Sequence, residues 1–166
     1  MRVSPTIALR PALDADRGFL AEVYAGTRAE ELALVGFSAE QRAAFLAQQF
    51  EAQRVHYAKH FSGASYDIVL VDGEAAGRLI VDRREHEIRV VDLAVLPAQR
   101  SRGIGGALLR AIIVEADAAG VAVTFHVERF NRAIRLYERL GFTTVSDDGM
   151  HLLVQRPPGG QAKTAS

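Results

Sequence analysis

The sequence predicts an α/β protein, in the broad sense that includes α+β folds, and three observations support this prediction. Patterns typical of strands and helices follow the order strand, two helices, three strands, helix, strand, helix and two strands. Asp-Gly pairs at 72–73 and 148–149 mark tight turns between neighbouring strands. A glycine-rich segment at 103–106 joins an apolar strand to an amphipathic helix.

The first elements are a strand and two helices. A short strand is expected at residues 6–10, and Asp14 is expected to cap a helix that runs to about residue 34. The segment Ser38-Ala39-Glu40-Gln41 has the pattern of a capping box, which predicts a second helix through about residue 60.

Three strands come next. They are expected at 65–71, 75–81 and about 87–96, with Asp72-Gly73 as the hairpin turn between the first two. Pro97 has no backbone N–H, so it should end the third strand.

The last elements begin at the glycines. A helix is expected from Gly103, followed by a strand at 121–127 whose side chains alternate in polarity. Asn131 is expected to cap a further helix, and Gly141 to end it. Two strands then flank the turn Asp147-Asp148-Gly149.

Composition indicates one globular domain, expected at residues 1–156, with a flexible polar tail at 157–166. The chain has 166 residues, of which 49% are hydrophobic, and its 20 basic and 20 acidic side chains balance. Without a broad basic field, we expect no nucleic-acid partner. The absence of cysteine excludes a disulfide scaffold, and no long apolar segment predicts a membrane span, so a cytoplasmic location is expected.

The glycine segment has the features of an anion-binding loop. The first N–H groups of a helix lack intrahelical partners, and glycine lets an anion approach the backbone closely. Arg100 and Arg102 add positive charge beside the segment. A dinucleotide-binding loop fits poorly because Leu108 stands in place of its third glycine, and the Gly-Lys-Ser/Thr triplet of nucleotide hydrolases is absent. From the residues alone, an ordinary glycine turn with two solvated arginines stays open.

Tyr137 lies in the expected last helix. A phenol can serve as a general acid. The alternative is an amphipathic core residue whose hydroxyl lies at the rim.

Three motifs resemble those of the GCN5-related N-acetyltransferase (GNAT) superfamily. Arg100-Ser101-Arg102-Gly103-Ile104-Gly105 matches its acyl-CoA motif, Gln/Arg-x-x-Gly-x-Gly/Ala, and Leu93-Ala94-Val95-Leu96-Pro97 matches the strand before it. The stretch from Asn131 to Phe142 matches its final helix and the start of the next strand. The resemblance implies a single mixed, mostly antiparallel, twisted sheet of about seven strands flanked by about four helices, with CoA in the splay between the fourth and fifth strands.

The resemblance also implies the ligands and the roles of several residues. Acetyl-CoA would be the co-substrate, and no metal is implied. Backbone N–H groups at 102–107 would hold the CoA pyrophosphate, the strand at 93–95 would pair with the pantetheine arm, and Tyr137 would protonate the departing thiolate. The implied CoA-binding residues are Leu93, Ala94, Val95, Arg100, Arg102, Gly103, Ile104, Gly105, Gly106, Ala107, Asn131 and Tyr137.

The expected activity is transfer of an acetyl group from acetyl-CoA to a primary amine, with a small molecule as the favoured acceptor. Without cysteine there is no cysteinyl intermediate, so direct transfer is expected. Two alternatives stay open: acetylation of a protein or peptide, and a noncatalytic regulatory module that binds CoA. A monomer or a homodimer is expected.

An ammonium acceptor must lose a proton before it attacks, so a base is needed. The expected catalytic candidates are Asp92 and Glu87 on the strand before the glycine segment, and His126 and Glu128 at the end of the next strand are further candidates for the base. Arg89 falls where histone-modifying relatives carry a glutamate, which disfavours a base of that type. A water chain, with the carboxylates as surface charges, is the alternative.

The acceptor is expected to bind at the first pair of helices. Glu30 and Glu31 could attract a cationic amine there. The other candidates for the pocket are Phe37, Gln49, His56 and His126. The alternative is that the rings belong to the core and the polar groups to a wet helix surface.

Overall fold

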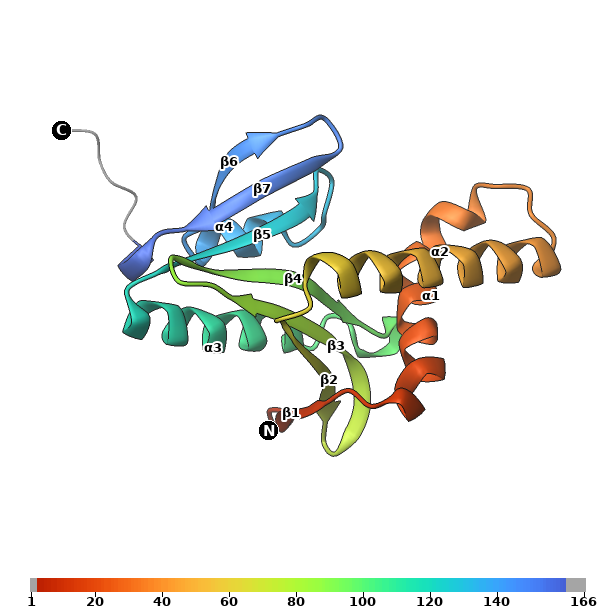
Figure 1. Ribbon diagram of the computed structural model, residues 1–166, viewed down its shortest axis with the longest axis horizontal. Helices are drawn as coiled ribbons and strands as arrows, with labels where there is room; N and C mark the ends of the chain where they lie inside the picture. Colours follow the sequence, from red (N-terminus) through yellow and green to blue (C-terminus); the bar gives the residue numbers. More distant parts are fainter. Residues whose placement is uncertain (1–2, 161–166) are drawn as a thin grey trace. The chain divides into compact units, whose positions relative to one another are not determined.

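The computed structural model describes residues 3–160, and its elements follow the predicted order (Figure 1). The strands are β1 (Ile7–Pro11), β2 (Ser65–Val71), β3 (Glu74–Arg83), β4 (Glu87–Val95), β5 (Ala122–Glu128), β6 (Thr143–Asp147) and β7 (His151–Arg156). The α-helices in this range are α1 (Arg17–Ala33), α2 (Ala39–His60), α3 (Ile104–Ala119) and α4 (Ile134–Arg139). Short 3-10 turns are η1 (Asp14–Asp16), η2 (Pro97–Gln99) and η3 (Pro158–Gly160).

The seven strands form one sheet in the order β1-β2-β3-β4-β5-β7-β6. The pairs β1–β2, β5–β7 and β6–β7 are antiparallel, whereas β4 and β5 are parallel. The parallel register runs from Glu87↔Ala122 to Val90↔Phe125. The predicted α/β class, with a mixed seven-stranded sheet and four helices, is therefore confirmed for the described residues.

The chain divides into two compact units. The first comprises Met1–Ile80 with Asp92–Arg102, and the second comprises Val81–Val91 with Gly103–Ser166. The expectation of one domain at 1–156 stays a prediction.

In the first unit, the capping box predicted at Ser38 is confirmed. The Gln41 N–H donates to Ser38 Oγ at 3.1 Å, and the Ser38 N–H donates to Gln41 Oε1 at 2.8 Å. The predicted cap at Asp14 is wrong, because Asp14 opens η1 and α1 begins only at Arg17. Asp16 takes the structural role there, since its carboxylate accepts hydrogen bonds from the Leu13 N–H and from Arg10, each at 2.8 Å.

The predicted hairpin turn between β2 and β3 is confirmed. Asp72 and Gly73 have φ values of 51° and 83°, and two positive φ values in succession are typical of a turn that matches the twist of antiparallel strands. The buried apolar residues of this unit include Val23, Leu32, Ile68, Val69, Leu79 and Ile80.

In the second unit, α3 packs against β5. Gly120, with φ of 70°, ends α3 in the left-handed conformation that glycine adopts readily. The buried apolar residues here include Ile104, Leu109, Ile112, Val123, Phe125 and Val127.

The structure corrects the start of the last helix. Asn131 is not its N-cap, because the residue directly before the helix is Ala133. The Asn131 side chain accepts a hydrogen bond from the Ala133 N–H at 2.7 Å, within the turn that precedes the helix. The helix α4 therefore begins only at Ile134. Gly141 follows its end with φ of 97°, as predicted.

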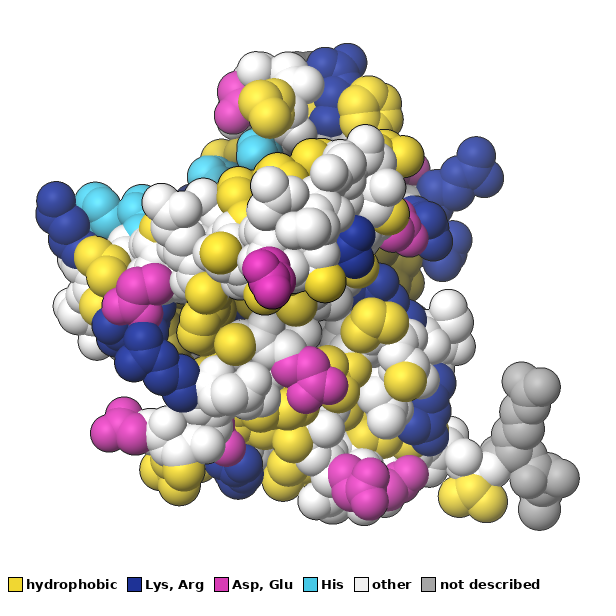
Figure 2. Space-filling model, turned by 90° about the vertical axis from the view of Figure 1, so that its right-hand side faces the viewer, with side chains coloured by type: hydrophobic (Ala, Val, Ile, Leu, Met, Phe, Trp, Pro, Cys, Tyr) yellow, Lys and Arg dark blue, Asp and Glu magenta, His cyan; other side chains and the backbone are white. Residues whose placement is uncertain are grey.

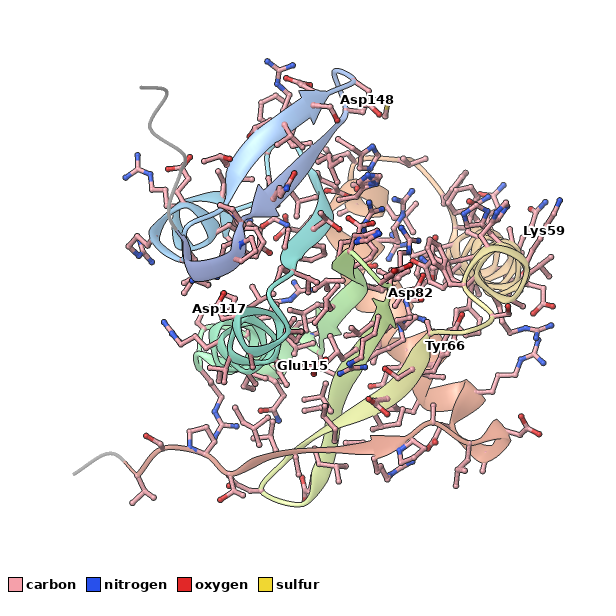
Figure 3. All side chains as sticks on the ribbon, turned by 60° about the vertical axis from the view of Figure 1, so that its left-hand side comes forward. Lys59, Tyr66, Asp82, Glu115, Asp117 and Asp148 are labelled. Atoms are coloured by element: carbon pink, nitrogen blue, oxygen red, sulfur yellow. The ribbon has the colours of Figure 1, made fainter. Side chains whose placement is uncertain are left out.

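The predicted tail begins at residue 157, and its first residues have defined contacts. The Gly159 N–H in η3 donates to the carboxylate of Asp117, which lies on α3 (Figure 3), at 2.9 Å. Residues 161–166 of the predicted tail lie outside the described part of the chain.

No helix within residues 3–160 is long and apolar enough to cross a membrane. On the face drawn in Figure 2, acidic and basic side chains are interspersed with apolar ones.

Candidate functional site

A half-buried polar cluster joins α2 to the sheet within the first unit. Arg78 on β3 forms an ion pair with Asp92 on β4, and its Nη2 also donates to Gln53 Oε1 on α2 at 3.0 Å. The Tyr57 hydroxyl donates to Asp92 Oδ2 at 3.2 Å, and the Arg78 guanidinium carbon lies 5.9 Å from the centroid of the Tyr57 ring. Arg78 is only 7% exposed, so its charge depends on these partners.

The two oxygens of Asp92 have different surroundings. Oδ2 receives the bonds from Arg78 and Tyr57, whereas no described residue donates to Oδ1. Burial and the negative charge of Asp92 raise the pKa of Tyr57, which keeps the phenol protonated as a donor. One oxygen of this predicted catalytic carboxylate thus has no donor among the described residues, and the Asp92 side chain is 17% exposed.

The end of β4 lies tightly against β3. A Cβ added at Gly77 would collide with the Ala94 carbonyl oxygen and lie 3.0 Å from Val95 Cα. The Leu96 N–H donates to the Ala76 carbonyl at 2.8 Å. Of the predicted ligand-binding residues here, Ala94 is buried, while Leu93 and Val95 are half-buried.

Both arginines before the glycine segment have partners within the first unit. Arg100 Nη2 donates to the Gly26 carbonyl on α1 at 3.0 Å. Arg102 Nη1 donates to Gln99 Oε1 at 2.5 Å, and Arg102 also lies 3.8 Å from the Asp72 carboxylate. Their guanidinium groups therefore contact protein groups as well as solvent.

The second unit contains the open start of α3. Gly103 is the N-cap with φ of 77°, and a Cβ at this position would meet no atom within 4 Å. The Ala107 N–H makes the helical bond to the Gly103 carbonyl at 3.0 Å, so the N–H groups of residues 104–106 precede the helical ladder. This arrangement leaves three N–H groups without helical partners directly after a glycine whose added Cβ would meet no atom, which suits an anion.

The other glycine of this segment has a packing role. A Cβ on Gly106 would lie 3.6 Å from Leu136 on α4 and 3.1 Å from the Arg110 side chain. Gly106 is buried and allows α3 and α4 to approach closely.

Tyr137 on α4 is 8% exposed and packs in edge contacts against two phenylalanines. The ring centroids of Phe125 and Phe142 lie 5.6 and 6.2 Å from that of Tyr137. Burial raises the pKa of Tyr137, and a hydrogen bond with the Asn131 side chain partly opposes this rise. The ring is thus part of the core, while its hydroxyl is a protonated donor at neutral pH.

The second predicted carboxylate, Glu87, is held by a polar network in the second unit. Thr124 Oγ1 donates to Glu87 Oε2 at 2.8 Å, and Arg84 Nη1 donates to Oε1 at 2.8 Å. Arg89 Nε donates to Thr124 Oγ1 at 2.7 Å. Burial alone would raise the pKa of Glu87, but the hydrogen bonds from Thr124 and Arg84, together with the charge of Arg89, lower it overall.

His126 is exposed on β5, between the buried Phe125 and Val127. Burial of part of its ring lowers the pKa of His126, and the positive charges of Arg89 and His151 lower it further. The negative charge of Asp148, which lies in the turn between β6 and β7 (Figure 3), raises the pKa of His126 and partly opposes this lowering.

The residues predicted for the acceptor pocket make separate local contacts. Glu31 pairs with Arg28 at 3.3 Å, and Glu30 is exposed. The other three predicted residues in the first unit are Phe37, His56 and Gln49. The ring centroids of Phe37 and Phe45 lie 5.6 Å apart, and those of His56 and His60 lie 4.4 Å apart. Gln49 is half-buried. A hollow of the first unit lies elsewhere and is lined by Arg54, Ala58, Ser62 and Tyr66.

Sequence reasoning missed Arg78, the buried partner of Asp92. Its signal is a single charged residue inside the otherwise apolar run of β3. Among the described residues, no group of three or more His, Asp or Glu side chains is arranged to hold a metal ion.

Comparison with known proteins identifies the fold family. The model of the acetyltransferase (GNAT) domain matches residues 62–144, which is half of the chain. No curated protein matches the sequence.

Several solved structures share the fold. The PaiA N-acetyltransferase of Thermoplasma acidophilum, solved in complex with coenzyme A, has 17% identity and a TM-score of 0.68 over 92% of this chain and 99% of its own. A Corynebacterium glutamicum structure, described as histone acetyltransferase HPA2 and related acetyltransferase, has 25% identity and a TM-score of 0.64 over 94% and 97%. The ribosomal-protein-S18-alanine N-acetyltransferase of Escherichia coli has 19% identity and a TM-score of 0.61 over 97% and 99%. The chain therefore belongs to the GNAT acetyltransferase family.

Proposed function

We propose that the protein transfers an acetyl group from acetyl-CoA to the primary amine of a small molecule, by direct transfer. The observation that carries this proposal is the open, glycine-capped start of α3, because it presents unpaired N–H groups of the kind that bind a pyrophosphate. Family membership supports the same ligand.

The chain's own groups fit acetyl-CoA. The N–H groups of residues 104–106 would hold the pyrophosphate, and the backbone of Leu93–Val95 would bind the pantetheine arm and polarise the acetyl carbonyl. Acetyl-CoA supplies an already activated thioester, so the protein needs chiefly to position the two reactants and manage two protons.

Tyr137 is proposed as the acid that returns a proton to the CoA sulfur as the C–S bond breaks. Its pKa is raised by burial, so the proton is present at neutral pH. The contacts with Phe125 and Phe142 hold the ring in place. The ammonium form of the acceptor must lose one proton before it attacks, which requires a separate base. A second proton leaves the nitrogen as the C–N bond forms and balances the proton that Tyr137 gives to the sulfur.

We propose Asp92 rather than Glu87 as the base that takes the proton of the ammonium form. Both oxygens of Glu87 already accept hydrogen bonds, and its lowered pKa weakens it as a base. Asp92 keeps Oδ1 free of donors among the described residues, so an amine or a bound water can reach a lone pair there.

A small acceptor is proposed because the cluster at Asp92 offers a few convergent polar groups. Tyr57 from α2 and Arg78 from β3 both contact Asp92, and Gln53 on α2 accepts from Arg78, so polar groups converge in the first unit as they do in small-molecule sites.

The proposal is tested by measuring CoA release from acetyl-CoA in the presence of polyamines, amino acids, aminoglycosides and short peptides. Acceptor-dependent release with a small amine supports the proposal, and mass spectrometry of the product should show one added acetyl group. Release with peptides alone would assign a protein or peptide acceptor instead. Tight binding of acetyl-CoA without release for any compound would favour a noncatalytic CoA-binding module.

A further inference from the structure

A contact within the first unit fixes the segment after β4 against α1. A Cβ added at Gly26, inside α1, would lie 2.9 Å from Pro97 Cδ and 3.2 Å from Pro97 Cγ. Arg100 Nη2 donates to the carbonyl of the same glycine at 3.0 Å. One residue of α1 thus contacts both ends of the segment 97–100, which directly precedes the glycine segment.

The glycine at this position is required for close approach. Glycine in a helix interior destabilises the helix relative to alanine, so its presence in α1 needs a reason. Gly18 in the same helix has no atom within 4 Å of an added Cβ, whereas Gly26 faces the proline ring. Because residue 26 has no side chain, the Pro97 ring can pack closely against the backbone of α1.

Arg100 completes the contact through hydrogen bonding. A carbonyl oxygen has two lone pairs, so the Gly26 carbonyl can accept from Arg100 while it belongs to α1. The guanidinium that the sequence motif assigns to the ligand is in this structure bonded to a helix backbone.

We propose that Gly26 and Arg100 are positioning residues for acyl-CoA binding: they fix residues 97–100 against α1 and so place the loop that leads to Gly103. Arg100 then acts through the loop backbone rather than as a phosphate ligand. This inference rests on the proposed binding of CoA at the start of α3.

The test is calorimetric titration of CoA into the wild-type protein, Gly26→Ala and the matched control Gly18→Ala. Residues that couple two parts of a protein typically change binding by 0.5–2 kcal/mol, so Gly26→Ala should raise the Kd roughly twofold to thirtyfold. Gly18→Ala should leave the Kd unchanged, because its new methyl group meets no atom. Circular dichroism and melting curves establish that each variant is folded.

The outcomes separate this inference from the proposed function. A wild-type protein that does not bind CoA refutes the proposed function itself. A folded Gly26→Ala protein that binds CoA like wild type overturns the inference.

Arg100→Ala gives a second test that does not depend on the stability of the Gly26 variant, since Arg100 is exposed. If both residues act through one contact, the loss of affinity in the double variant is smaller than the sum of the single losses. Additive losses would mean that Arg100 binds the ligand directly, and would overturn its assignment as a positioning residue. If Gly26→Ala does not fold, Arg100→Ala is measured alone, and an unchanged Kd overturns the inference.

Discussion

On α4, the Tyr137 ring has a packing role, and the Tyr137 hydroxyl has the proposed chemical role of proton donor. Tyr137→Phe keeps the ring between Phe125 and Phe142 and removes only the proton donor. We expect kcat to fall on the order of 10²-fold, a typical share for a general acid, with little change in the Kd for acetyl-CoA. The measurement is steady-state CoA release with an acceptor identified by the panel.

A matched control is available in the first unit. Tyr24 has the same 8% exposure and a ring contact with Phe50 at 6.0 Å, so Tyr24→Phe makes the same chemical change at a buried ring. It should leave kcat unchanged. Equal kcat for Tyr137→Phe and wild type would remove Tyr137 as the acid.

The two carboxylates predicted as bases can be separated by their pH profiles. Asp92→Asn should lower kcat/KM at neutral pH and let it recover as the pH rises, because more of the amine is then deprotonated in solution. Glu87→Gln should change this profile less, since Glu87 is held by Thr124 and Arg84. Both variants lose a paired charge, so their melting temperatures are measured alongside. A larger loss in Glu87→Gln than in Asp92→Asn would contradict the assignment.

Sequence reasoning found some residues of the candidate site and missed others for a physical reason. Asp92 and Tyr137 were predicted because their chemistry and motif position are visible in the chain. Arg78 was missed, since strand alternation tells which face a side chain occupies but not which side chain on another element it meets. The same limit applies to Gly26, whose partner is 71 residues further along the chain, at Pro97.

At the scale of elements, two features of Gly103 at the start of α3 matter: its backbone conformation and the space around it. Its φ of 77° disfavours any side chain, and its open surroundings leave room for a ligand. Gly149, in the turn before β7, has φ of 93° and equally open surroundings. Gly103→Ala and Gly149→Ala should both lower stability by about 1–2 kcal/mol, the usual penalty of this conformation. Only Gly103→Ala should weaken CoA binding, as measured by calorimetry, and equal affinities for the two variants would count against the anion-binding role.

The elements themselves were predictable where local rules decide them. The capping box at Ser38 and the turn at Asp72-Gly73 depend on neighbouring residues, and both are confirmed. The start of α4 was not predictable from the capping rule, because the Asn131 side chain makes a bond of the capping kind to the Ala133 N–H while residues 131–133 form a turn and the helix begins only at Ile134. Local rules thus predict that an element exists better than they predict its first residue.

At the scale of the whole molecule, three motifs in the second half sufficed to predict the family, but they do not specify the acceptor. The predicted acceptor residues lie mostly on α1 and α2, where side chains make separate local contacts. CoA that binds only the folded state should nevertheless stabilise the whole protein, whichever acceptor the protein acetylates.

This linkage gives a prediction that needs no acceptor. CoA at 100 times its Kd should add about 2.7 kcal/mol to the free energy of unfolding. For a chain of 166 residues, each kcal/mol raises Tm by about 2–4 °C, so a shift of roughly 5–11 °C is expected in a thermal melt. Desulfo-CoA should produce a similar shift, because the pyrophosphate rather than the sulfur contacts the N–H groups of residues 104–106. Gly103→Ala should respond less at the same concentration, since each tenfold loss of affinity removes about 1.4 kcal/mol of this stabilisation. A Tm that stays constant up to millimolar CoA would show that the folded protein does not bind it, and would refute both the ligand and the reaction proposed here.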